Sequence, residues 1–132
     1  MRTLWIVLLA AVGSATASDP PVPRPRLLES VPADFLGEWS SDLADCGSPN
    51  NESVLKIEST HISYYDRNGP LNSVLAYDHC EDNIELISEL SSDGEKMCTI
   101  TREQFRLDQD QLIAILDGGD FVRYRCPVSA AP

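Results

Sequence analysis

Residues 54–77 read VLKIESTHISYYDRNGPLNSVLAY, and this stretch decides the fold class because short apolar runs alternate with turn residues. Val54–Ile57, Ile62–Tyr65 and Leu71–Tyr77 each have the length and composition of a short strand. Asp66–Pro70 contains an Asn-Gly pair, which favours the positive φ of a tight hairpin turn. The stretch therefore predicts three successive antiparallel strands.

The same pattern continues towards the C-terminus. Within Ile84–Leu90 apolar and polar residues largely alternate, as in a strand with one buried face. The apolar positions change from even to odd numbers between Ile100 and Phe105, which predicts a bulge or a new strand near residues 102–104. Counting a strand through Trp39, the chain holds about eight short strands and no sustained helical period.

A meander of about eight strands removes its exposed edges most simply by closing on itself. We therefore expect an all-β fold, a small antiparallel up-and-down barrel reinforced by disulfides. The cysteines that would form them are Cys46, Cys80, Cys98 and Cys126. In such a barrel the last strand returns beside the first, so Cys46 is expected to pair with Cys126. That leaves Cys80 to pair with Cys98, and each bond is worth about 2–4 kcal/mol.

The N-terminus predicts export. Arg2 precedes the uncharged apolar run Leu4–Val12, and Ala15-Thr16-Ala17 has the small-x-small pattern of a signal-peptidase site. We expect residues 1–17 to be removed and the mature protein to be periplasmic or secreted. No cysteine sits at the cleavage point and no later segment is apolar enough to stop transfer, so no membrane anchor is expected.

The predicted domain organisation follows from this reading. Residues 18–31 form a proline-rich leader, residues 32–127 the barrel domain, and residues 128–132 a tail. The formal net charge is −11 for the whole chain, and removal of Arg2 with the signal peptide makes it −12. Such an acidic chain is not expected to bind nucleic acid, whereas a cationic partner fits it.

The segment Pro32–Trp39 contains Phe35-x-Gly37-x-Trp39, and this start of an up-and-down barrel resembles the lipocalin and lipocalin-like superfamily. In that family the tryptophan plugs the closed end of the barrel, and a basic residue of the last strand lies over its face. The resemblance implies a barrel plug formed by Gly37, Trp39 and either Arg123 or Arg125. With Ala44-Asp45-Cys46 and Tyr124-Arg125-Cys126, the chain also resembles small exported proteobacterial proteins whose function is uncharacterised.

No motif predicts catalysis, a metal site or a cofactor. The two histidines, His61 and His79, match no compact metal site, and the carboxylates cluster in turns. Asn51-Glu52-Ser53 has the pattern of an N-glycosylation acceptor, relevant only in a eukaryotic source. Tyr64 and Tyr65 are adjacent, so one ring should face outward as a possible protein contact.

The sequence thus predicts a non-enzymatic binding module for a small apolar ligand or an envelope component. The alternative is an acidic protein-interaction module that inhibits a cationic envelope hydrolase such as lysozyme. A ligand carrier needs an apolar cavity of about 300 Å³ or more, whereas the alternative needs acidic loops and tolerates a filled core. The identity of the partner and the oligomeric state stay open.

Overall fold

The computed structural model describes residues 11–16, 19, 24–77, 80–92 and 99–128. Its regular elements, in chain order, are β1 (Pro25–Leu28), the 3₁₀ turn η1 (Ala33–Phe35), β2 (Gly37–Ser40), the 3₁₀ turn η2 (Leu43–Asp45), β3 (Leu55–Ile57), β4 (His61–Tyr64), β5 (Arg67–Tyr77), β6 (Cys80–Ser92), β7 (Thr99–Asp108), β8 (Gln111–Ile115) and β9 (Phe121–Arg125). The described part of the chain is therefore all-β apart from two short 3₁₀ turns.

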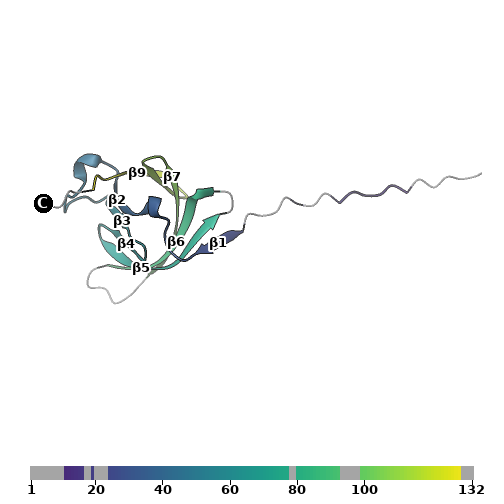
Figure 1. The fold of residues 1–132 in the computed structure, drawn as a ribbon, viewed down its shortest axis with the longest axis horizontal. Helices are drawn as coiled ribbons and strands as arrows, with labels where there is room; N and C mark the ends of the chain where they lie inside the picture. Colours follow the sequence, from purple (N-terminus) through teal and green to yellow (C-terminus); the bar gives the residue numbers. More distant parts are fainter. Residues whose placement is uncertain (1–10, 17–18, 20–23, 78–79, 93–98, 129–132) are drawn as a thin grey trace, which may run out of the picture.

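Strands β2 to β9 form a closed antiparallel barrel (Figure 1). Each strand pairs with the next along the chain, and β9 returns to pair with β2. At this closure Trp39 lies opposite Arg125, and Ser40 lies opposite Tyr124. The up-and-down barrel predicted from the alternating strands is confirmed.

The interior of the barrel is filled by its own side chains. Trp39, Leu55, Ile84, Phe105 and Leu112 have no exposed surface. Phe35 from η1 belongs to the same cluster and is 1% exposed. An eight-stranded barrel has an interior just wide enough for side chains to fill it, and these large residues occupy that width.

Strand β1 corrects the predicted leader of residues 18–31. Residues 25–28 pair with β5, from Pro25 opposite Tyr77 to Leu28 opposite Val74, and Val31 is buried. The reason lies in β5, which pairs with β4 only as far as Pro70 and so has an edge for another strand beyond that point. Proline at the first position of an edge strand removes no ladder hydrogen bond that the strand needs.

The turn predicted at Asn68-Gly69 is wrong. The chain reverses at residues 65–66, and both Asn68 and Gly69 lie inside β5 without a positive φ. A Cβ atom on Gly69 would lie 1.6 Å from the backbone oxygen of Glu89 in β6. Glycine is therefore required here because two strands approach closely, and not because the chain turns.

The bulge predicted near residues 102–104 is also absent from the described strands. The β6–β7 register runs without interruption from Asn83 opposite Arg106 to Leu90 opposite Thr99. The apolar positions change because Ile100 faces outward and is 58% exposed, whereas Phe105 lies in the core. The register shifts lie instead between β5 and β6.

Replacing Gly69 by alanine tests the close strand approach. We expect Gly69→Ala to lower the free energy of unfolding by about 1–3 kcal/mol, because the methyl group meets backbone that cannot rotate away. Gly118→Ala is the matched control, since a Cβ there would have no neighbour within 4 Å. Urea unfolding followed by tryptophan fluorescence measures both. Equal midpoints for the two variants would show that the strands do not approach at Gly69.

Candidate functional site

One end of the barrel is plugged. Trp39 Nε1 donates a hydrogen bond of 3.0 Å to the backbone oxygen of Phe35. The guanidinium of Arg125 lies 4.2 Å from the centre of the Trp39 ring, donates from Nη1 to the Leu36 oxygen at 2.8 Å, and donates from Nη2 to the Asp34 oxygen. These contacts join β9 to β2 and to the segment from Asp34 to Leu36 that crosses this end of the barrel.

The other residues of the implied plug lie as follows. Gly37 has a φ of 125°, and a Cβ atom there would lie 3.4 Å from Nη1 of Arg125. Arg123 lies away from Trp39, because its Nε donates to the Ser53 oxygen at 2.7 Å and its guanidinium lies over Phe121. Of the two arginines that the sequence offered for the contact with Trp39, the structure places Arg125 there.

The disulfide Cys46–Cys126 fixes the long loop after β2. Its cysteines have Cα atoms 5.7 Å apart and are separated by 80 positions in the sequence. The predicted pairing of these two cysteines is present, and it attaches η2 to the end of β9. The predicted Cys80–Cys98 pair lies outside the residues whose side chains the structure describes.

At the opposite end, which we call the open end, the barrel has a pocket of about 400 Å³. The loops 65–66 and 116–120 and the two ends of loop 41–54 meet there, as the ends of β2, β4 and β8 show, whereas Cys46 in the middle of loop 41–54 is bonded to Cys126 beyond the end of β9. The pocket is lined by Glu52, Tyr64, Tyr65, Asp66, Arg67, Glu103, Ala114, Leu116, Phe121 and Arg123.

The floor of this pocket carries charged groups that are partly sheltered from water. The Tyr64 hydroxyl donates to Glu103 Oε2, and the Arg67 guanidinium lies 4.9 Å from the centre of the Tyr64 ring. Burial, and then the neighbouring Glu103 carboxylate, raise the pKa of Tyr64, so its hydroxyl keeps its proton. Burial also lowers the pKa of Arg123 from its very high ordinary value, yet the guanidinium stays charged.

The sequence reasoning missed Glu103 and Arg67 in this pocket. Glu103 is two positions before Phe105, so the alternation of β7 places it on the same inward face as that core residue. Tyr64 and Tyr65 separate as expected, because Tyr65 is 49% exposed at the rim while Tyr64 bonds Glu103 inside.

The loops of the open end carry a strongly acidic surface. Their exposed carboxylates at this end belong to Asp42, Glu52, Asp66, Asp117 and Asp120, whereas Asp45 precedes Cys46 and lies towards the end of β9. The same three loops contain no lysine or arginine. Exposed apolar surface lies beside these carboxylates, since Leu116 is 51% exposed. This combination of negative charge and apolar surface is the kind found where proteins meet.

The remaining candidates have structural roles. Asn51 is 3% exposed, its Nδ2 donates to Ser40 Oγ at 2.9 Å, and its Oδ1 accepts from Ser53. An amide held inside in this way is no acceptor for glycosylation in the folded protein. His61 Nε2 lies 3.2 Å from Asn68 Oδ1, and His79 lies outside the described residues. Among the described residues no three His, Cys, Asp or Glu side chains are grouped so as to hold a metal ion.

The plug generates a stability prediction. Trp39→Ala should lower the free energy of unfolding by about 3–5 kcal/mol, because a fully buried indole leaves a cavity that the barrel cannot close. Tyr124→Ala removes an aromatic ring from the outer surface of β9 and should cost no more than about 1 kcal/mol. Denaturant unfolding measures both variants. A Trp39→Ala variant within about 1 kcal/mol of the wild type would rule out the plug.

Comparison with known proteins gives no relative from which a function could be transferred. No protein-family model, curated protein or solved structure matches the chain. Within the described residues, no helix has the length and apolar character needed to cross a membrane. The function has to be inferred from the barrel, its pockets and its charges.

Proposed function

We propose that this chain is an exported, non-enzymatic binding module of lipocalin-like architecture, and that it holds a small, largely apolar ligand or envelope component at the open end of its barrel. The observation that carries the proposal is the pocket of about 400 Å³ above a filled interior. This volume lies within the range of ligand pockets, which begins near ~300 Å³. Because core side chains fill the centre of the barrel, we place the ligand at the open end.

The lining of the pocket indicates the chemistry of the ligand. Ala114, Leu116 and Phe121 offer an apolar wall, whereas Arg123 supplies a positive charge at the floor. A ligand with an apolar body and one anionic or strongly polar group would satisfy both surfaces. A partly buried guanidinium attracts such a group more strongly than an exposed one does, because less water screens the interaction.

The polar groups of the pocket support binding rather than catalysis. Tyr64 donates to Glu103, Arg67 lies 3.9 Å from Glu103, and Arg123 donates to a backbone oxygen. The raised pKa of Tyr64 keeps this hydroxyl from acting as a base near neutral pH. No histidine or cysteine lines the pocket within the described residues, and its inner carboxylate, Glu103, is engaged by Tyr64 and Arg67.

Export is supported by the Cys46–Cys126 disulfide, since such bonds persist in oxidising compartments. In the reducing cytoplasm the two thiols would stay unbonded, and the loop 41–54 would not be held to the end of β9. We therefore keep the proposal of a periplasmic or secreted protein.

A second function is favoured by the acidic loops. Five exposed carboxylates at the open end, with no basic residue in the same loops, would attract a cationic protein such as an envelope hydrolase of the lysozyme kind. Leu116 and Phe121 would supply the apolar part of that contact. In this case the pocket would receive a side chain of the partner in place of a free ligand.

Ligand titrations separate the two functions. We expect a short-chain fatty acid to bind with little dependence on salt, and more tightly than the alcohol of the same chain length, because Arg123 recognises the carboxylate. Arg123→Gln should abolish the preference for the acid, and Phe121→Ala should weaken both ligands. Tyr124→Ala, on the outer face of the same strand, should change neither affinity.

Lysozyme is titrated in parallel at low and high ionic strength. Binding of lysozyme that weakens as salt rises, together with no binding of the fatty acid or its alcohol, would replace the ligand-carrier proposal by the protein-interaction function. Fatty-acid binding that survives Phe121→Ala unchanged would place the ligand elsewhere on the molecule.

A further inference from the structure

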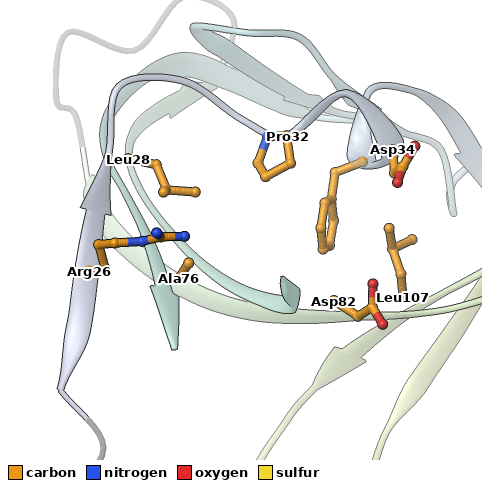
Figure 2. Close-up of a pocket in the computed structure, with 8 residues that line it drawn as sticks. Arg26, Leu28, Pro32, Asp34, Ala76, Asp82 and Leu107 are labelled. Atoms are coloured by element: carbon orange, nitrogen blue, oxygen red, sulfur yellow. The ribbon is translucent and has the colours of Figure 1, made fainter. Parts of the chain in front are cut away.

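A second pocket, of about 210 Å³, lies at the plugged end of the barrel. Figure 2 shows Arg26 reaching into it from one side, while Asp34, Asp82 and Leu107 lie on the other side. Phe35 and Leu28 also line this pocket, and Phe35 is 1% exposed. The pocket shares no residue with the open-end site, so it is a separate place on the molecule.

The N-terminal segment assembles this pocket. Arg26 is fixed by the pairing of β1 with β5, which sets it opposite Ala76. Asp34 belongs to η1, which leads into β2, and Asp82 lies near the start of β6. The N-terminal segment and the distant strand β6 therefore bring one cation and two carboxylates to the same hollow.

The opposite charges face each other without being joined. Among the described residues no salt bridge within 4.0 Å links Arg26 to Asp34 or Asp82. Apolar surface from Phe35 and Leu107 lies in the same pocket. A positive wall, a negative wall and an apolar surface together match a molecule that carries both charges and an apolar part.

We propose that this pocket binds a small zwitterion, namely a free α-amino acid with an apolar side chain. The carboxylate of the amino acid would pair with the guanidinium of Arg26, a geometry that permits two parallel hydrogen bonds. The ammonium group would lie between Asp34 and Asp82, and the side chain would cover Phe35 and Leu107. The volume of about 210 Å³ lies below the range for drug-sized ligands, which begins near ~300 Å³, so the pocket has room only for a smaller molecule such as an amino acid.

The test uses L-leucine and two matched analogues that each lack one charge. Titrations followed by amide NMR shifts of the full mature protein compare leucine with 4-methylpentanoate, which lacks the ammonium, and with 3-methylbutylamine, which lacks the carboxylate. We expect saturable binding of leucine in the millimolar range or tighter, and binding of each analogue at least about tenfold weaker, because each loses one charged contact.

Variants locate the site. Arg26→Gln and Asp82→Asn should each weaken leucine binding at least about tenfold. Arg106→Gln is the control, because Arg106 is exposed on the neighbouring strand and does not line the pocket. Phe121→Ala, at the open end, should leave leucine binding unchanged. All four side chains are exposed, so the substitutions should leave the fold intact. Amide shifts that stay unchanged away from the substituted positions would show this.

Three results would overturn the proposal. The first is the absence of any saturable shift up to the solubility of leucine, as expected if Arg26 only forms ion pairs with the facing carboxylates. The second is equal binding of leucine and either analogue. The third is leucine binding that Arg26→Gln and Asp82→Asn leave intact, which would place the amino acid at another site.

Discussion

The rest of the structure depends on the contact between Arg125 and Trp39. The guanidinium lies 4.2 Å from the ring centre and donates to the backbone oxygens of Leu36 and Asp34. It therefore joins the last strand of the barrel to the first, and holds η1 across the end of the core. A cation over an indole contributes about 0.5–2 kcal/mol, and here the guanidinium also donates hydrogen bonds to two backbone carbonyl groups.

This closure determines where recognition can take place. Trp39 and Phe35 fill one end of the interior, and Phe105 with Leu112 fills the middle, so the barrel has no room for a ligand at its centre. Each end of the barrel offers a hollow, and the chemistry of the two differs. The open end combines an apolar wall with a half-buried cation and acidic loops, whereas the plugged end sets one arginine against two aspartates.

Local sequence patterns predicted the strand order, the closed barrel and the Cys46–Cys126 bond, because alternation and turns are encoded by neighbouring residues. They did not predict β1, since the pairing of Pro25–Leu28 depends on how far β4 covers the edge of β5. Gly69 was assigned to a turn because its role, a close approach to Glu89, involves a distant strand. Glu103 was accessible to sequence reasoning through the parity of β7, whereas its hydrogen bond with Tyr64 required the fold.

A double-mutant cycle on Trp39 and Arg125 tests the central claim most directly. The variants Trp39→Leu and Arg125→Gln, alone and combined, are unfolded in urea and their free energies of unfolding compared. The account predicts a coupling of about 1 kcal/mol or more, because either change alone removes the stacking that the other residue needs. Effects that add to within about 0.5 kcal/mol would show that the two residues act independently and that their contact does not close the barrel.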